Sequence, residues 1–135
     1  MKASVLYRIA AVLLLLFAAG HLLGFRQTDP AWGIDPTLSS LRAIHFDVQG
    51  FPRTYLDFYN GAGFSIGVAY LFFMILAWQL GGLPAETLKR MRFVTWSFAA
   101  CFVALTLISW QYLFTIPFVF SLLISLCLIP AALSR

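Results

Sequence analysis

Three polar side chains of the kind that could do chemistry lie inside apolar segments of the sequence. His21 lies near the end of the first apolar run, and Asp57 and Asn60 lie three residues apart at the start of the second. An ionisable residue in a membrane segment is costly and is therefore a functional candidate. Residues three apart share a helix face. Asp57 and His21 could then exchange protons with an apolar substrate that Asn60 orients.

Asp57 and His21 each have a structural interpretation as well. Thr54-Tyr55-Leu56-Asp57 fits a capping box, in which Thr54 caps a helix and Asp57 reaches back to it. The positive end of the helix dipole would also favour this carboxylate. His21 could donate a hydrogen bond to a loop carbonyl, or it could pair with Asp57 across two helices, which would orient the imidazole. The sequence leaves these alternatives open.

The long connection before the second apolar run adds His45, Asp47 and Arg53, which we expect near the same end. His21, His45, Asp47 and Asp57 could form a histidine–carboxylate metal site, but neither HxxxH nor HExxH spacing is present. We therefore predict no metal and no cofactor. Arg53 with Asp47 and Asp57 predicts a salt-bridged rim rather than an active site.

Glycines gather in the same two segments. Gly20 and Gly24 flank His21, and Gly63 and Gly67 repeat the same spacing in the second run. Small residues four apart let membrane helices approach closely, so this pattern predicts tight helix packing. The alternative is that Gly61, together with Gly63, leaves room for a ligand.

The elements that must position these residues follow from composition. Of 135 residues, 61% are hydrophobic and only 10% are charged, against about 25% charged in ordinary soluble domains. A soluble domain of this size could not bury so much apolar surface. The composition excludes a soluble enzyme, a disordered chain and a nucleic-acid-binding protein. It predicts a polytopic membrane protein with a single domain over 1–135.

Four apolar stretches reach the roughly 20 residues that a membrane-spanning helix needs. They cover about 5–25, 55–80, 93–113 and 116–133. Only helices can satisfy their own backbone in this setting, so we predict an all-α bundle of four transmembrane helices. The first stretch also looks like a signal peptide. We expect it to be retained, because the apolar run continues past Ala18-Ala19-Gly20 to Phe25.

The connection over 26–54 carries a further helical pattern. Asp35-Pro36 is a favourable helix start, and apolar residues then recur every three or four positions up to Val48. This predicts a short amphipathic helix over about 36–48, lying on the outer surface of the membrane or folded over the mouth of the bundle.

Basic residues indicate the orientation of the spans. One face would hold six of them: Lys2, Arg8, Lys89, Arg90, Arg92 and Arg135. The other would hold three: Arg26, Arg42 and Arg53. The positive-inside rule then places both termini in the cytoplasm.

Two blocks of sequence resemble a family. The first is Ala18-Ala19-Gly20-His21-Leu22-Leu23-Gly24. The second runs from His45 through Arg53-Thr54-Tyr55 to Gly61. Together they resemble a group of small bacterial inner-membrane proteins with four predicted helices. The resemblance extends over nearly the whole chain and implies this architecture and origin, but it implies no activity. A looser analogy exists with membrane sterol isomerases and sigma-2-like receptors, whose carboxylate spacing this chain lacks.

These observations support three functional hypotheses. The first is a protein that binds a membrane lipid or another hydrophobic molecule in an outer-half pocket near His21, Asp57 and Asn60. The second is a small isomerase or hydrolase that uses Asp57 and His21. The third is a structural subunit that binds a partner membrane protein or a second copy of itself. None of the three involves nucleic acid.

Overall fold

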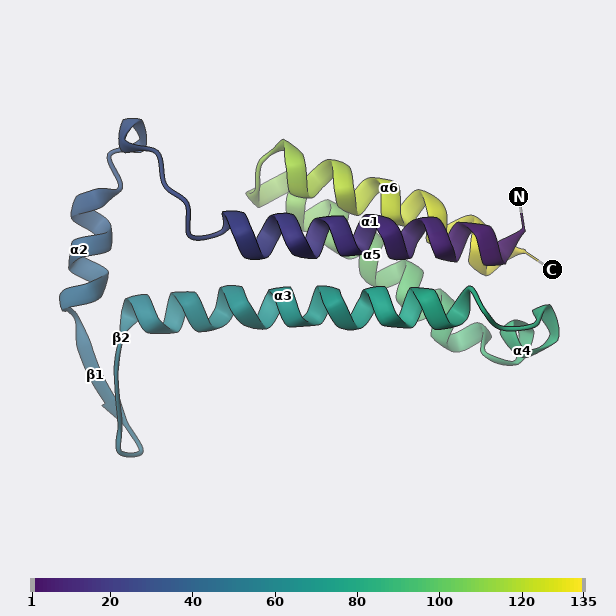
Figure 1. The fold of residues 1–135 in the computed structure, drawn as a ribbon, viewed down its shortest axis with the longest axis horizontal. Helices are drawn as coiled ribbons and strands as arrows, with labels where there is room; N and C mark the ends of the chain where they lie inside the picture. The colour runs from purple at the N-terminus through teal and green to yellow at the C-terminus, as the bar shows by residue number, and fades with distance from the viewer. Residues whose placement is uncertain (1, 135) are drawn as a thin grey trace. The chain divides into compact units, whose positions relative to one another are not determined.

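The computed structural model describes residues 2–134, and its architecture is helical (Figure 1). Four helices are long and apolar enough to cross a membrane. They are α1 (Ala3–Gly24), α3 (Tyr55–Leu80), α5 (Arg92–Tyr112) and α6 (Thr115–Leu133). The chain is therefore a multi-pass membrane protein, and the predicted all-α four-helix membrane fold is confirmed.

Local sequence signals mark both ends of α3. Thr54 caps its first turn, and Gly81 and Gly82 follow its last residue, where backbone bonds tighten the chain into a turn. Pro84 then precedes α4 (Ala85–Arg90), a short helix that the sequence analysis did not predict. Gly and Pro end helices because they supply flexible backbone and remove a donor.

The helix predicted over 36–48 is wrong in its second half. After η1 (Pro30–Trp32), α2 covers only Asp35–Ala43. An antiparallel hairpin follows, made of β1 (His45–Val48) and β2 (Phe51–Thr54), with Val48 opposite Phe51. Its two turn residues, Gln49 and Gly50, both have positive φ (56° and 81°), as a two-residue hairpin turn requires.

The chain divides into two compact units. The first, called here the core unit, comprises residues 1–18 and 70–135, and the second, the hairpin unit, comprises residues 19–69. The single domain predicted over 1–135 stays a prediction.

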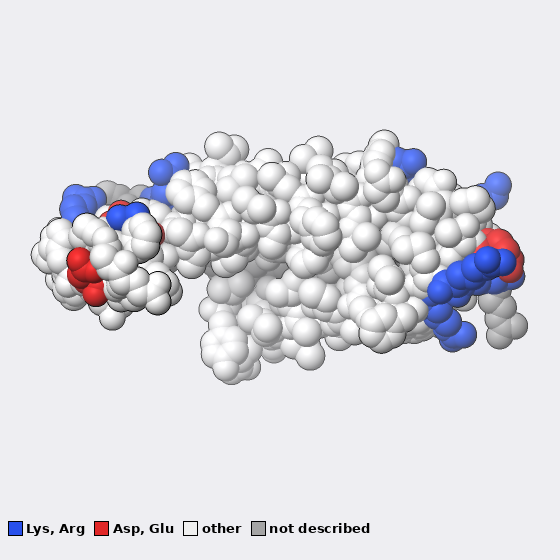
Figure 2. All heavy atoms as spheres, turned by 90° about the horizontal axis from the view of Figure 1, so that it is seen from below, with Lys and Arg blue, Asp and Glu red and all other residues white. Residues whose placement is uncertain are grey.

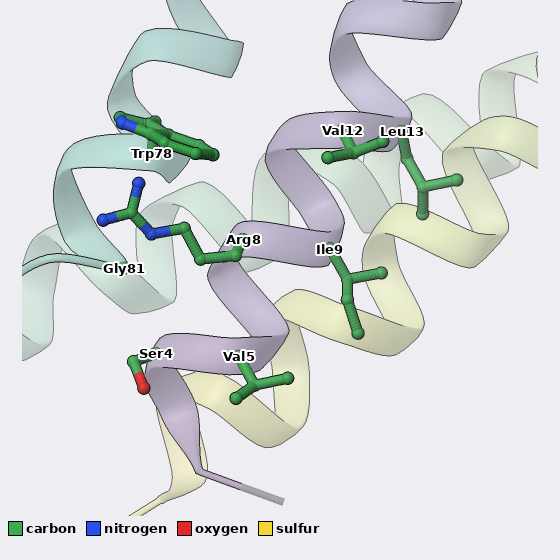
Figure 3. A pocket seen from close by; sticks show the side chains of 8 residues that line it. All are labelled: Ser4, Val5, Arg8, Ile9, Val12, Leu13, Trp78 and Gly81. Carbon is green, nitrogen blue, oxygen red and sulfur yellow. The ribbon is translucent and has the colours of Figure 1, made fainter.

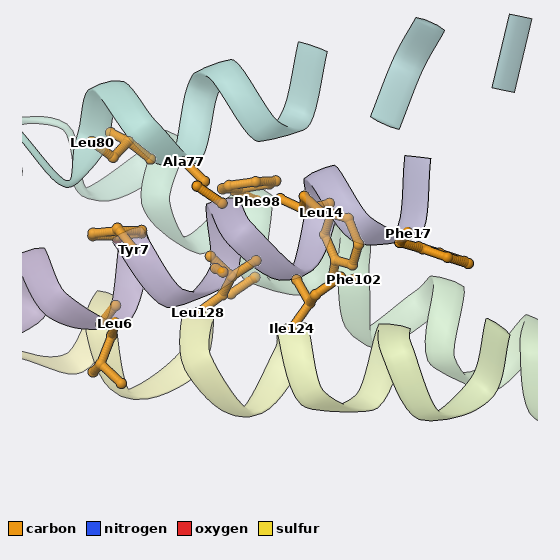
Figure 4. Close-up of a cluster of buried hydrophobic side chains, with 14 residues drawn as sticks. Leu6, Tyr7, Leu14, Phe17, Ala77, Leu80, Phe98, Phe102, Ile124 and Leu128 are labelled. Atoms are coloured by element: carbon orange, nitrogen blue, oxygen red, sulfur yellow. The ribbon is translucent and has the colours of Figure 1, made fainter. Parts of the chain in front are cut away.

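Large side chains from all four long helices fill the middle of the core unit (Figure 4). Tyr7 and Leu14 of α1, Phe102 of α5 and Leu128 of α6 are almost completely buried. The Phe102 ring lies 5.5 Å from the ring centroids of both Phe73 and Phe98. Aromatic pairs in such tilted or edge-to-face arrangements add to the gain from burial.

Most of the face drawn in Figure 2 is uncharged, and the charged side chains on it are confined to a few separate places. Within the core unit, one hollow is lined by residues from the start of α1, the α3–α5 connection and the end of the chain. These residues are Lys2, Ala3, Ser4, Leu83, Ala85, Leu88 and Ser134. Lys2 and helix α4, which carries Lys89 and Arg90, therefore belong to the same end of the core unit.

Candidate functional site

His21 anchors the end of α1 to α3 within the hairpin unit. Its Nε2 atom lies 2.8 Å from the carbonyl oxygen of Gly63. A carbonyl can only accept, so this nitrogen carries the proton. The imidazole is half-buried and stacks against Phe25, with 5.3 Å between ring centroids. A histidine bonded to a backbone carbonyl was one of the interpretations of the sequence, although this carbonyl lies in a helix rather than in a loop.

Phe25 extends this contact into an aromatic cluster. Its backbone carbonyl accepts a hydrogen bond of 3.1 Å from the Tyr59 hydroxyl, and its ring meets Phe64 edge-on at 5.1 Å. The Arg26 guanidinium lies 5.2 Å above the Phe64 ring. The Phe25 ring and the Arg26 guanidinium, which directly follow α1, thus pack against the Phe64 ring of α3.

Gly63 and Gly67 make this approach possible. A Cβ atom at Gly63 would overlap the Phe25 ring, and one at Gly67 would overlap the Leu22 side chain. Both glycines are buried, as close packing requires. Gly61, by contrast, has open space where a Cβ would stand. The space above Gly63, which the sequence analysis offered to a ligand, is filled by Phe25.

Asp57 forms the capping box that the sequence predicted. Its Oδ2 atom accepts hydrogen bonds of 2.9 Å from both the backbone N–H and the hydroxyl of Thr54. In return, the Asp57 N–H donates to the Thr54 hydroxyl oxygen at 3.1 Å. The carboxylate is solvent-exposed, and in residues 2–134 no hydrogen bond or ion pair joins it to His21.

The other predicted site residues lie apart from this contact. Asn60 is half-buried on α3, whereas His45, Asp47 and Arg53 are exposed on the hairpin. Asp47 accepts a hydrogen bond from the Gly50 N–H at 3.0 Å, which supports the turn. Arg53 donates to the carbonyl of the adjacent Pro52 at 2.7 Å.

The predicted rim contains no ion pair within residues 2–134, although Arg53 lies near enough to Asp57 to interact with its charge. Among the described residues the one ion pair joins Lys89 to Glu86 at 3.4 Å, far along the sequence from Arg53. Exposed ion pairs gain little in water, and Arg53 binds its local backbone instead. Nor do any three His, Cys, Asp or Glu side chains in residues 2–134 lie close enough to hold a metal ion.

A second site, in the core unit, was missed by the sequence analysis. A groove of about 550 Å³ runs along α1 beside the end of α3 (Figure 3). The residues that line it are Ser4, Val5, Arg8, Ile9, Val12, Leu13, Trp78 and Gly81. The groove is shallow and largely open to its surroundings.

Among the described residues, Arg8 is the one charged residue that lines this groove. Its guanidinium carbon lies 3.7 Å from the centre of the Trp78 ring, a close cation–π contact. Its stem passes tightly over Gly81, where an added Cβ would lie 3.2 Å from the stem carbons. The Nη1 atom is buried with no hydrogen-bond partner, and no carboxylate in residues 2–134 forms an ion pair with Arg8.

The rest of the groove is apolar and open to its surroundings. Val5, Ile9 and Val12 recur at spacings of four and three, so they form one stripe on α1, and all three are exposed. Ser4 lines this groove and also the hollow of about 460 Å³ that contains Lys2. An apolar stripe, a cation and a polar hollow are thus adjacent along α1.

The missed signal was present in the sequence. Arg8 lies five residues inside α1, and a charge within a span is itself a functional candidate. We interpreted it only as a topology signal because it lies near a span end. Its partner Trp78 lies 70 positions later, and sequence spacing alone could not join the two.

Comparisons with protein-family models, with curated proteins and with solved structures gave no match for this chain. The resemblance to small bacterial inner-membrane proteins therefore stays a prediction.

Proposed function

We propose that the chain is a small integral protein of a bacterial inner membrane that binds a lipid or another hydrophobic molecule. The observation that carries this proposal is the open groove along α1, in which Arg8 adjoins an exposed apolar stripe. Pockets that combine apolar walls with a few polar groups are the usual form of small-molecule sites. In a membrane, the molecules at hand for such a wall are lipids.

The binding site that we propose differs from the one expected near His21, Asp57 and Asn60. There, Phe25 occupies the space above Gly63, His21 bonds to a carbonyl, and Asp57 caps its own helix. Each of these contacts supports a structural role for His21 and Asp57. Together with Phe25, His21 packs the end of α1 and the residues after it against α3. The groove instead offers unfilled volume with a charged group at its wall.

The proposed orientation has both termini in the cytoplasm. It is supported by the basic residues gathered at one end of the core unit, including Lys2, Lys89 and Arg90. In a chain whose two cysteines are replaced, a new cysteine at Glu86 should react with an impermeant maleimide only after the cells are opened. One at Thr28 should react in intact spheroplasts, and the reverse pattern would invert the topology.

Native mass spectrometry of the protein purified in mild detergent tests the binding function. We expect a lipid-sized adduct on the wild-type chain. Ile9→Trp, which fills the groove, should raise the Kd for the lipid about tenfold, a free-energy change of about 1.4 kcal/mol, and so lower the bound fraction.

Leu15→Trp is the matched control, because Leu15 is also exposed on α1 but does not line the groove. It should retain the adduct. A wild-type chain without any adduct, or equal retention by the two tryptophan variants, would overturn the proposed function.

A further inference from the structure

We infer that the occupant of the groove is an anionic phospholipid whose phosphate binds the Arg8 guanidinium. This inference rests on the proposed function and names the class of ligand. It begins from the charge of Arg8, which lines the groove and has no carboxylate partner among the described residues. A phosphate oxygen in the groove would supply the opposite charge and a hydrogen-bond acceptor.

The guanidinium is held in a fixed orientation. Trp78 covers one face of it at 3.7 Å, and the stem is confined by close contact with the backbone at Gly81 (Figure 3). A planar fork of donors suits phosphate oxygens, and holding it still reduces the entropy lost on binding. Lysine would supply the charge without this planar geometry.

Arg8 lies near the start of a candidate membrane span, as a side chain that binds a lipid headgroup would. Arg8 lies five positions after the first residue of the helix, which corresponds to about 7.5 Å along the axis. Tryptophan favours the interface between hydrocarbon and headgroups, and Trp78 lies in the last turn of α3. The apolar stripe continues past Arg8 through Ile9 and Val12, so an acyl chain would extend along it toward the membrane interior.

The surroundings of Arg8 favour a net negative headgroup over a zwitterionic one. The adjoining hollow contains Lys2 and the Ser4 and Ser134 side chains, and within residues 2–134 no acidic side chain lines either the hollow or the groove. The ammonium of a phosphatidylcholine would lie among like charges there. Repulsion of this kind is an effective source of specificity.

The test is a titration of delipidated protein with phosphatidylglycerol or with phosphatidylcholine of the same acyl chains, read by native mass spectrometry. For the wild-type chain we expect about tenfold stronger binding of phosphatidylglycerol, as a charged hydrogen-bonded contact would give. Arg8→Gln should reduce phosphatidylglycerol to the level of phosphatidylcholine, and Arg8→Lys should retain part of the preference. Equal elution volume and helical circular dichroism would show that the variants fold.

Arg90→Gln is the matched control, since it removes the same charge at the same end of the core unit but does not line the groove. It should leave the preference unchanged. Inorganic phosphate added in excess should not displace the lipid, and displacement by phosphate would overturn a lipid-specific site.

The outcomes separate this inference from the function on which it rests. If both lipids bind equally, or if the preference survives Arg8→Gln, the anionic-lipid inference fails and lipid binding stands. In that case Arg8 serves only to stack on Trp78 and to interact favourably with the negative end of the α3 dipole. If neither lipid binds, the proposed function fails as well.

Discussion

Different kinds of contact stabilise the core unit and the hairpin unit, each considered by itself. The core unit buries large rings and branched side chains from four helices, with Phe102 and Leu14 inaccessible. In the hairpin unit only Gly63 and Gly67 are buried among residues 19–69. That unit depends on a histidine–carbonyl bond, a tyrosine–carbonyl bond and a capping box. The comparison shows that large buried side chains stabilise the core unit, whereas close packing at glycines stabilises the hairpin unit.

This difference predicts opposite sensitivities, and the largest effect should come from the core unit. Phe102→Ala removes a ring that packs against Phe73 and Phe98, which should lower the free energy of unfolding by about 3–5 kcal/mol. Thermal unfolding in detergent micelles measures the change. Phe93→Ala on the same helix is the control, because its ring is 85% exposed. Similar losses for both variants would show that burial does not distinguish them.

In the hairpin unit, replacing a small buried residue by a larger one should lower the free energy of unfolding. Gly63→Ala places a methyl group where the Phe25 ring lies, and we expect a loss of about 1–3 kcal/mol. Gly61→Ala, two residues earlier on α3, adds the same group in open space and should not destabilise the protein. The same unfolding measurement applies. If both variants unfold at the wild-type temperature, the close approach at Gly63 does not contribute to stability.

The smallest effect should come from the cap of α3. Thr54→Ala removes the hydroxyl that accepts from the Asp57 N–H, and we expect a loss of about 1 kcal/mol. Thr54→Ser keeps the hydroxyl and should restore most of it. Hydrogen exchange at the amides of residues 55–58 should accelerate in the alanine variant alone. Unchanged exchange there would mean that the hairpin, rather than the cap, fixes the start of α3.

Physical signals confined to short stretches of sequence were predicted well. The bounds of α3 match the prediction because a capping box and a Gly-Gly pair mark its two ends, and the other spans agree to within about two residues. The capping role of Asp57 was also among the interpretations, because it depends only on residues 54–57.

The hairpin was missed because two periodicities overlap in one segment. Leu38, Leu41, Ile44 and Val48 recur as on a helix, yet from His45 onward polar and apolar residues alternate as on a strand. The Gln49-Gly50 turn settles the segment as a hairpin, because both residues adopt the positive φ that such a turn uses and that a helix does not allow. Gln is not a usual first residue of such a turn, so the signal was weak.

Contacts between distant segments were beyond the sequence. Spacing placed His21 and Asp57 near the adjoining ends of two spans but could not show that each binds a different partner. Likewise, it gave the charge of Arg8 without the ring that covers it. A helix rotates by about 100° per residue, so pairing two helix faces requires their packing and not their sequences alone.

The junction between β2 and α3 has a mechanical consequence. Thr54 is the last residue of the strand and also caps the helix, while the Tyr55 N–H bonds back to Ile44 at 3.2 Å. The hairpin and the first turns of α3 therefore have no hinge between them. A pull on the hairpin tip would act as torque on this segment, and inserting one residue at the junction would change its angular setting by about 100°.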